Sequence, residues 1–306
     1  MSLRDFASVL LRPPDASELD AIHALLRTRD LIDLGFADVA REDLDDEWRA
    51  PGFDQGADAV VCELGGAVCG YAALRRTHAL AAVAPGFEGR GIGTLLLEWT
   101  ERRASERERE VYSQEVARSN ARAARLLSDR GYTWVRSYTR MERALEPLDG
   151  PVGPSGLTLR PLELHDDART LYAIDASSFA AVPDYRPMSF EQFRAEHLEE
   201  HDVAGELSLV AESHGRPLGF AISRRWAAER IGYVDVLAVV PEAQGAGVGT
   251  SLLGGVFERF AGAGLRSAQL GVASDNQRAL ALYRRMGMSE RFQVDSYERA
   301  VVAAGR

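Results

Sequence analysis

The chain contains no lysine, since all 36 of its basic residues are arginines. This absence excludes Schiff-base chemistry on a lysine and any phosphate-binding loop that ends in Gly-Lys-Ser or Gly-Lys-Thr. Long apolar runs are also missing, because none approaches the ~18 residues needed to span a bilayer. The first residues show no basic segment followed by an apolar stretch and a cleavage site, so we expect a cytoplasmic protein.

Cysteine is scarce, with only Cys62 and Cys69 in 306 residues. The two cysteines flank a predicted two-residue turn at residues 65–66, and the simple register of such a hairpin pairs Cys62 with Cys69. We expect both thiols to be reduced, because the chain shows no secretion signal.

Histidine offers little for a metal site. His197 and His201 lie one helical turn apart, which is compatible with metal binding, but the sequence supplies no third ligand near them. We therefore interpret both as part of a solvated helix face, and we predict no bound metal.

Basic residues are outnumbered, with 36 against 46 acidic ones and a net charge of −10. Neither half carries a compensating basic stripe, so the sequence predicts neither nucleic acid nor an anionic membrane as a partner. The charge permits a cationic small-molecule substrate. The length indicates about two domains of ~150 residues each.

The chain carries one sequence pattern twice. "PGFEGRGIGTLLL" at residues 85–97 returns as "PEAQGAGVGTSLL" at residues 241–253, an offset of 241 − 85 = 156. The same offset carries Asn120 to Asn276. Nearer the start of each copy, Arg12 falls on Arg160 at an offset of 148, so the second copy contains a short insertion before its loop, in "SRRWAAERIGY". Such a repeat indicates a duplicated unit.

We predict two domains, at residues 1–146 and 157–306, joined by a linker rich in proline and glycine at residues 147–156. Each copy reads as a strand, one or two helices, a hairpin, a strand, the glycine loop, a helix, a strand, a helix and a last strand. This order predicts an α/β fold with a mixed sheet in each copy. The helix after the second loop has one apolar face, made of Val248, Leu252, Leu253, Val256, Phe257 and Phe260.

The glycine loops can bind an anion. A strand that enters a helix through glycines exposes unpaired backbone N–H groups at the helix N-terminus, which suits a phosphate. A purely structural turn accounts for the loop alone about as well. A dinucleotide fingerprint does not fit, because Leu252 stands where its third glycine is required.

At these residues the chain resembles the GNAT acetyltransferase superfamily. The family signature, an apolar strand and proline followed by Gln/Arg-x-x-Gly-x-Gly/Ala, is matched by Val239, Pro241, Gln244, Gly247 and Gly249. A second family element, an asparagine followed by a tyrosine seven residues later and then by a glycine and an apolar residue, is matched by Asn276, Tyr283, Gly287 and Met288. The resemblance covers both repeats and is closest to tandem two-domain members.

The resemblance implies an N-acetyltransferase that moves the acetyl group of acetyl-CoA to a primary amine of a small molecule or peptide, by direct attack in a ternary complex. It implies that the backbone of Leu237 and Val239 pairs with the pantetheine arm, that Asn276 binds that arm, and that Tyr283 protonates the leaving thiolate. The Val239 N–H is the candidate to polarise the acetyl carbonyl. The pyrophosphate would lie on Gln244, Gly245, Ala246, Gly247, Val248, Gly249 and Thr250.

The acceptor side has weaker signals. Simple alternation places Tyr233, Asp235, Leu237 and Val239 on one face of their strand, which makes Asp235 a candidate base acting directly or through water. The alternative is a carboxylate that bonds backbone at a strand irregularity. Asp184 and Tyr185, in a proline-bounded loop, are candidate substrate contacts, although an ordinary helix–helix connection explains this loop equally well.

The first copy departs from the family pattern at three places. Glu88 replaces Gln244 and repels a pyrophosphate unless Arg90 compensates, Leu127 replaces Tyr283, and Ala79 replaces Asp235. We therefore predict that the second copy is catalytic and the first degenerate. Weak CoA binding by the first loop stays open, through Gly89, Arg90, Gly91, Gly93 and Thr94.

Two alternatives stay open. One is a non-catalytic acyl-CoA-binding or regulatory protein of the same fold, and the other is a nucleotide-phosphate enzyme. The sequence is compatible with a monomer or a homodimer, because duplication can supply internally the pairing that single-domain relatives obtain by dimerising.

Overall fold

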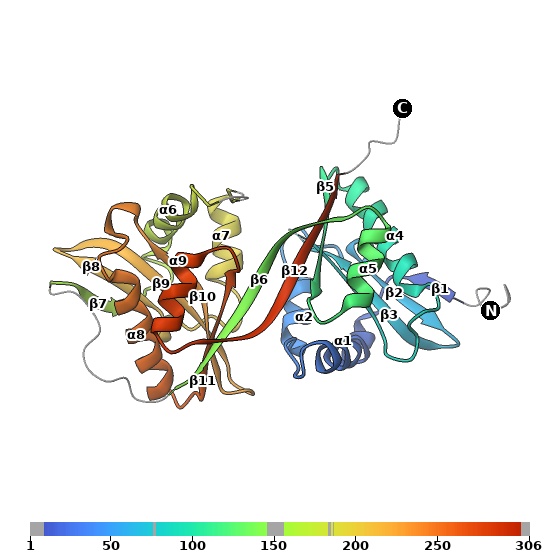
Figure 1. The fold of residues 1–306 in the computed structure, drawn as a ribbon, viewed down its shortest axis with the longest axis horizontal. Helices are drawn as coiled ribbons and strands as arrows, with labels where there is room; N and C mark the ends of the chain where they lie inside the picture. Colours follow the sequence, from blue (N-terminus) through green and yellow to red (C-terminus); the bar gives the residue numbers. More distant parts are fainter. Residues whose placement is uncertain (1–8, 76–77, 146–155, 183–184, 186, 301–306) are drawn as a thin grey trace. The chain divides into compact units, whose positions relative to one another are not determined.

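The computed structural model describes residues 9–75, 78–145, 156–182, 185 and 187–300 (Figure 1). These residues form two compact units. The first contains the chain up to residue 138 together with the residues from 292 on, and the second contains residues 139–291.

Both repeats have the predicted order of elements. In the first, these are β1 (Val9–Arg12), the 3₁₀ turn η1 (Ala16–Glu18), α1 (Leu19–Asp33), α2 (Arg41–Arg49), α3 (Gln55–Asp58), β2 (Ala59–Leu64), β3 (Ala67–Leu74), β4 (Ala79–Val83), α4 (Ile92–Glu106), β5 (Val111–Ala117), α5 (Ala121–Asp129) and β6 (Thr133–Ala144). From β7 on they are β7 (Thr158–Pro161), α6 (Ala168–Phe179), α7 (Phe190–His197), the 3₁₀ turn η2 (Gly205–Leu207), β8 (Leu209–Ser213), β9 (Arg216–Trp226), β10 (Ile231–Val239), the 3₁₀ turn η3 (Pro241–Ala243), α8 (Val248–Gly262), β11 (Ser267–Ala273), α9 (Gln277–Arg285) and β12 (Ser289–Ala300).

Each unit has a mixed sheet, which confirms the predicted fold class. In the first unit the order is β1-β2-β3-β4-β5-β12, and in the second it is β11-β10-β9-β8-β7. The pairs β4–β5 and β10–β11 are parallel, and the other pairs between these strands are antiparallel. The predicted insertion lengthens the β9–β10 hairpin, because both strands are longer than their counterparts β3 and β4.

The last strand belongs to the first unit. β12 pairs antiparallel with β5, from Val294 opposite Ala117 to Ala300 opposite Val111. Arg118, just after β5, binds Asp295 on β12 at 2.8 Å. The compact units therefore do not coincide with the halves predicted at 146 and 157. Residues 147–155 of the predicted linker lie outside the described residues.

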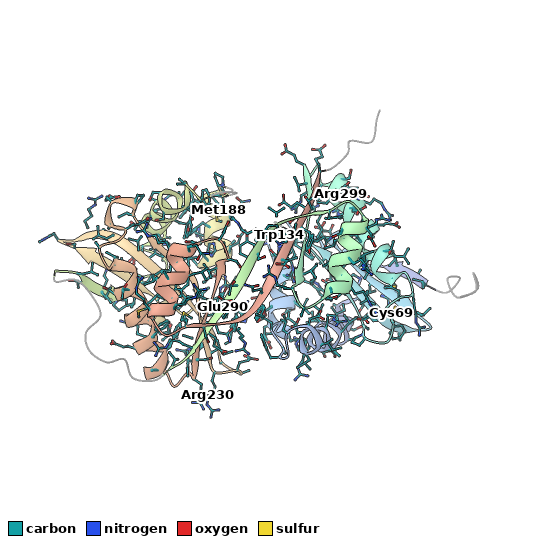
Figure 2. All side chains as sticks on the ribbon, in the orientation of Figure 1. Cys69, Trp134, Met188, Arg230, Glu290 and Arg299 are labelled. Atoms are coloured by element: carbon teal, nitrogen blue, oxygen red, sulfur yellow. The ribbon has the colours of Figure 1, made fainter. Side chains whose placement is uncertain are left out.

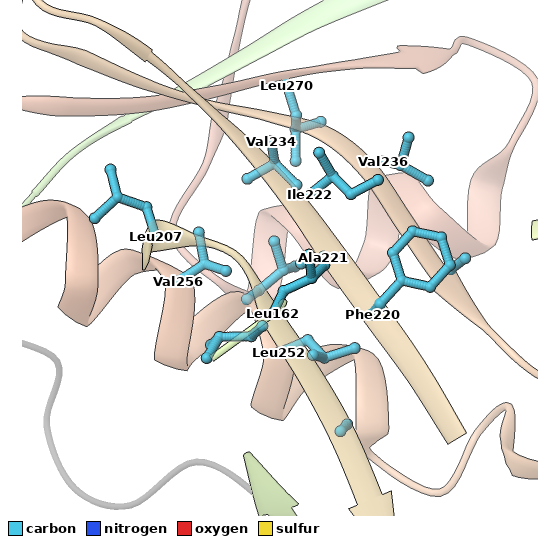
Figure 3. Packing of buried hydrophobic residues seen from close by; sticks show 14 of the residues in the cluster. Leu162, Leu207, Phe220, Ala221, Ile222, Val234, Val236, Leu252, Val256 and Leu270 are labelled. Carbon is cyan, nitrogen blue, oxygen red and sulfur yellow. The ribbon is translucent and has the colours of Figure 1, made fainter. Parts of the chain in front are cut away.

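The core of the second unit lies between its sheet and α8. Figure 3 shows Leu252 and Val256 of α8 packed with residues of β9 and β10. All six residues of the predicted apolar face of α8 are at most 2% exposed. Gly232 of β10 lies directly under Phe260, because a Cβ there would be only 2.2 Å from the ring. The apolar face that the helical periodicity predicted is thus the face of α8 that packs against the sheet.

The cysteine hairpin departs from the simple register. Glu63 pairs with Val68 as predicted, but a bulge follows and Cys62 pairs with Gly70 instead of Cys69. Both cysteines are buried free thiols in the first unit, where Figure 2 labels Cys69. Their Sγ atoms are 3.6 Å apart, and burial raises the pKa of each thiol. A glycine-glycine turn predicts the hairpin but not the extra residue of a bulge, so the sequence could not predict this change of register.

Within the described ranges, no helix is both long enough and apolar enough to cross a lipid bilayer.

Candidate functional site

The second glycine loop ends in an uncapped helix. Gly247 is the N-cap residue of α8 and has φ +89°, and Gly245 before it has φ +85°, a region that favours glycine. No side chain caps α8, and the first intrahelical bond of its N-terminus is from Ser251 N to Gly247 O at 3.0 Å. The preceding N–H groups of the first turn therefore have no helical partner, which is the arrangement that binds an anion.

An arginine lies beside this loop without a matching carboxylate. Arg278 of α9 donates to Gln244 Oε1 at 2.7 Å, and no described carboxylate forms an ion pair with it. Its Nη2 is 3.7 Å from the position of a Cβ on Gly245. The loop therefore combines unpaired backbone N–H groups with a guanidinium whose charge no described carboxylate neutralises.

The two central strands separate next to the loop. β10 pairs with β11 only from Ile231 to Val234, although both strands continue beyond that point. The N–H of Val240 bonds Leu218 O of β9, so the N–H groups of Val239 and Leu237 point to the opposite side, toward the gap. The backbone that was predicted to pair with the pantetheine arm is thus open on the required side.

A bulge in β10 overturns one predicted alignment. Val234 pairs with Ser223 and Val236 with Ile222, so Asp235 is the extra residue. Tyr233 pairs with Arg224 and Leu237 with Ala221, and since β9 alternates regularly, Tyr233 and Leu237 point to opposite faces. The prediction that residues 233, 235, 237 and 239 share one face is therefore wrong, because the pleat alternation is broken at Asp235.

Asp235 is bound by two side chains rather than by backbone. Its Oδ2 lies 2.7 Å from Nδ1 of His197 on α7 and 3.2 Å from Nη2 of Arg224 on β9. Arg224 also binds Glu200 and, at 3.1 Å, Asp202. Burial raises the pKa of Asp235, but the bond from His197 and the charge of Arg224 outweigh it, so the pKa lies below the ordinary value. Asp235 alone is thus a weak proton acceptor.

His197 is the residue that the sequence reading misplaced. Its side chain is only 19% exposed, and its ring packs on Phe193 with the centroids 5.2 Å apart. Burial lowers the pKa of His197, but the bond and charge of Asp235 more than reverse this and raise it above the ordinary value. In the sequence, the spacing of Phe193 and His197 by four residues was the only sign that His197 shares the buried face of its helix.

The tautomer of His197 follows from this geometry. A neutral imidazole that donates from Nδ1 to a carboxylate carries its lone pair on Nε2. Among the described residues, no group is hydrogen-bonded to Nε2. His197 can therefore accept a proton there, with Asp235 stabilising the resulting charge.

Tyr283 and Asn276 lie on α9, as the second motif predicted. Tyr283 is 8% exposed, and burial raises the pKa of its phenol to about 12, above the ordinary value near 10. Asn276 caps α9, because its Oδ1 accepts from Ala279 N at 3.1 Å. Within the described part of the chain, neither the Tyr283 hydroxyl nor the Asn276 N–H₂ group has a protein partner.

The predicted substrate loop is only partly described. Asp184 lies outside the described residues. Tyr185 is half-buried and stacks on Phe179 with ring centroids 6.4 Å apart. Burial and the neighbouring charge of Asp175 raise the pKa of Tyr185. Asp175, on α6, is a buried carboxylate that the sequence reading did not select.

The equivalent site of the first unit is occupied by its own side chains. Glu88 is bound by Arg122 at 2.9 Å and by Arg29, which also holds Asp33 at 2.6 Å. Asp33 in turn accepts from the amide of Asn120 at 2.9 Å. This network pairs the charged side chains beside the first loop, whereas no described carboxylate pairs with Arg278 beside the second.

Arg90, which we named as the residue that could compensate for Glu88, lies over the ring of Phe87, while Glu88 pairs with Arg29 and Arg122. The guanidinium of Arg90 lies 5.3 Å from the centroid of the Phe87 ring. Gly89 and Gly91 do have positive φ, and α4 starts without a side-chain cap, with Gly93 and Thr94 in its first turn. At the position of Tyr283, Leu127 is buried in the core.

The described residues contain no group of three potential metal ligands. A cavity of ≈ 10 Å³ beside His78 and Gln114 in the first unit holds no more than about one water. It lies apart from the features above and plays no part in the site.

Comparison with known proteins agrees with this geometry. The profile described as "Acetyltransferase (GNAT) family" matches residues 23–132 and 168–288, one region in each repeat. "Mycothiol acetyltransferase" of Streptomyces griseus subsp. griseus is 32% identical over 238 residues, covering 73% of this chain and 74% of that protein. The protein of the same name from Parafrankia sp. is 29% identical over 319 residues, covering 94% and 97%.

Solved structures give the same picture. A GCN5-related N-acetyltransferase from Sphaerobacter thermophilus has a TM-score of 0.82 and 26% identity, covering 96% of each chain. A tandem GNAT protein from the clavulanic acid biosynthesis pathway has a TM-score of 0.77 at 18% identity, covering 97% and 100%, and shares the fold. With the family profile matched in both repeats, the chain belongs to the GNAT family and is a tandem acetyltransferase of that type.

Proposed function

We propose that the second repeat catalyses transfer of the acetyl group of acetyl-CoA to a primary amine of a small molecule, and that the first repeat is a degenerate copy. The observation that carries this proposal is the contrast between the two loops. In the second, an uncapped helix N-terminus lies beside the unneutralised Arg278, whereas in the first, Glu88 neutralises the equivalent arginine.

The residues present fit acetyl-CoA. Bound there, the coenzyme supplies an activated acetyl group as a thioester. The N–H groups of residues 245–250 and Arg278 would hold its diphosphate, and the open backbone of Leu237 and Val239 would align its arm. The Val239 carbonyl is held by Ser178 and Gln244, each at 3.0 Å, so the backbone that carries the Val239 N–H is fixed in place. A fixed N–H group stabilises developing oxyanion charge without reorganisation.

Tyr283 acts as the general acid. Its raised pKa keeps the phenol protonated over the whole physiological range, and its hydroxyl has no described protein partner that would compete for the proton. The phenol would give its proton to the coenzyme's sulfur as negative charge builds there in the transition state.

His197 accepts the proton of the acceptor amine, and Asp235 acts through it as a positioning residue. We favour this over Asp235 acting alone, because the hydrogen bond from His197 and the charge of Arg224 lower the pKa of Asp235. The division of labour is that of an imidazole oriented by a carboxylate: Asp235 fixes the tautomer and stabilises the imidazolium that forms.

The names of the relatives support a small-molecule acceptor. Several are called mycothiol acetyltransferase, so the amine that they acetylate is the first acceptor to assay.

Matched variants of the two repeats test the proposal. Gln244→Glu converts the second loop to the charge of the first, and Glu88→Gln does the reverse. By calorimetry on the full chain, we expect Gln244→Glu to weaken acetyl-CoA binding by about 10-fold or more, since one lost charge-assisted contact costs about 1.5–3 kcal/mol. Glu88→Gln should leave the affinity of the high-affinity site unchanged. Equal effects of the two variants, or no binding by the native chain, would refute the assignment.

A further inference from the structure

Asp175 is a buried carboxylate without an ionic or hydrogen-bonding partner among the residues that the structure describes. It lies on the inward face of α6 with Leu171 and Ile174 and is 5% exposed. Among the described residues, none donates a hydrogen bond to it or forms an ion pair with it. Buried carboxylates are almost always paired, because removing an unpaired charge from water is costly.

The contacts of α6 place Asp175 over the acceptor side of β10. Ser178, three residues further along the same helix face, donates from its hydroxyl to Val239 O at 3.0 Å. One helical turn back from that contact, Asp175 comes within electrostatic range of His197 and Asp235. The carboxylate therefore faces the residues that we assign to proton transfer.

Burial disfavours the ionised form of Asp175. Burial raises its pKa to about 6, the charge of His197 acts in the opposite direction, and the charge of Asp235 adds to the rise. Arg224 does not relieve Asp175, because its guanidinium binds Glu200, Asp202 and Asp235. Arg169 and Arg194 lie over the Phe190 ring, at 4.5 Å and 5.9 Å from its centroid, and among the described residues neither forms an ion pair with Asp175.

Aromatic rings pack between α6 and α7, and Tyr172 is one helical turn before Asp175. Tyr172, on α6, lies 5.7 Å from both Phe190 and Phe193 of α7, between ring centroids. The Tyr172 hydroxyl is fixed by the carbonyl of Met188, labelled in Figure 2 in the segment before α7. Aromatic faces attract cations and offer no strong acceptor for a hydroxyl group. A free carboxylate one helical turn from Tyr172 favours a ligand that carries a positive charge on a carbon skeleton.

We propose that Asp175 is the binding residue for the protonated amino group of the acceptor. The inference rests on the proposed function, since it names the form in which the amine arrives. The ammonium group pairs with the Asp175 carboxylate. One N–H bond then breaks, its proton passes to Nε2 of His197, and the bonding pair stays on nitrogen as the nucleophilic lone pair. The enzyme thereby selects cationic primary amines against alcohols and anionic compounds.

A binding experiment without acetyl transfer tests this inference. Native protein is titrated by ligand-observed NMR with matched pairs, namely 2-phenylethylamine against 2-phenylethanol and butylamine against butanol. We expect the native chain to prefer each amine by about 10-fold or more, in line with about 1.5–3 kcal/mol for a charge-assisted bond. The isosteric Asp175→Asn should abolish the preference, whereas Glu258→Gln, an exposed carboxylate on α8, should retain it.

The outcomes separate the two proposals. Equal binding of amine and alcohol by the native chain, failure of the amines to bind, or a preference that survives in Asp175→Asn overturns the role of Asp175. Calorimetry with acetyl-CoA decides the proposed function independently, because Asp175→Asn should bind the coenzyme as the native chain does. In steady-state assays, Asp175→Asn should raise KM for the amine more than it lowers kcat, and raising the pH above the pKa of the amine should shrink this difference.

Discussion

Replacing Asp175 with asparagine should stabilise the protein at neutral pH. The pKa of Asp175 is raised from an ordinary 3.8 to about 6 in the folded chain, a shift of about 2 units. At 1.36 kcal/mol per unit, keeping the carboxylate ionised costs the folded state about 3 kcal/mol above pH 7. Asparagine keeps the shape and removes the charge, so it should recover most of this energy.

The effect has a definite sign with pH. The folded-state pKa lies above the unfolded one, so the protonated carboxyl favours folding below about pH 4, and this advantage is lost as the pH rises through about 6. The gain from Asp175→Asn should therefore be close to zero at pH 4 and grow by about 1.4 kcal/mol per pH unit up to pH 6. Above pH 7 it should be constant.

Hydrogen exchange measured by mass spectrometry on peptides from α6 and β10 gives the stability of the second unit alone. Native chain, Asp175→Asn and the control Glu258→Gln are compared at pH 5, 6, 7 and 8. If Asp175→Asn destabilises these peptides at every pH, Asp175 has a native cationic partner and the reasoning fails. A gain that does not change with pH would equally exclude an ionised carboxylate as its source.

Three further variants test the other assignments. Tyr283→Phe should lower kcat by about 100-fold or more, because it removes the general acid, with acetyl-CoA affinity by calorimetry unchanged; an unaltered kcat would remove Tyr283 from the mechanism. In the native enzyme, kcat/KM should rise with pH with a midpoint above ~6.5, because His197 must be neutral and its pKa is raised. The His197→Gln variant should lose this rise. If the rise persists in the variant, the titrating group is not His197. Gly247→Ala places a Cβ on a residue at φ +89°, which should lower the free energy of unfolding, measured with denaturant, by about 1–2 kcal/mol. It should also weaken acetyl-CoA binding. Full affinity in this variant would show that binding does not depend on the geometry of the loop.

The repeat made most of the fold predictable. The two glycine loops, the order of elements and the apolar face of α8 all follow from local patterns, and the structure has them as expected. The pairing of β12 with β5 was not predictable, because a strand has the same alternation of side chains whichever sheet it joins. The same holds for the bulge at Asp235, since one extra residue alters pairing without altering composition.

The acceptor side was predicted less well than the coenzyme side. Backbone groups of a glycine loop bind through their geometry, which glycine spacing reports directly. His197, Arg224 and Asp175 meet only through tertiary packing of α6, α7, β9 and β10, so no spacing in the sequence brings them together. His197 looked like a solvated residue because its neighbours in the chain are charged, whereas its neighbours in space are Phe193 and Asp235.

The divergence of the two loops can be explained by one pair of residues. The repeat offset of 156 carries Arg122 to Arg278 and Glu88 to Gln244, and both pairs are in contact, at 2.9 Å and 2.7 Å. In the first repeat the carboxylate neutralises the arginine, and Arg29 brings a further pair with Asp33, so the loop is electrically satisfied by the protein itself. In the second, the neutral amide orients the arginine without cancelling its charge. The charge at this position, together with the Arg29–Asp33 pair, thus separates a loop whose charged side chains pair with one another from one whose arginine has no described carboxylate partner. Both loops start an uncapped helix through a glycine at positive φ.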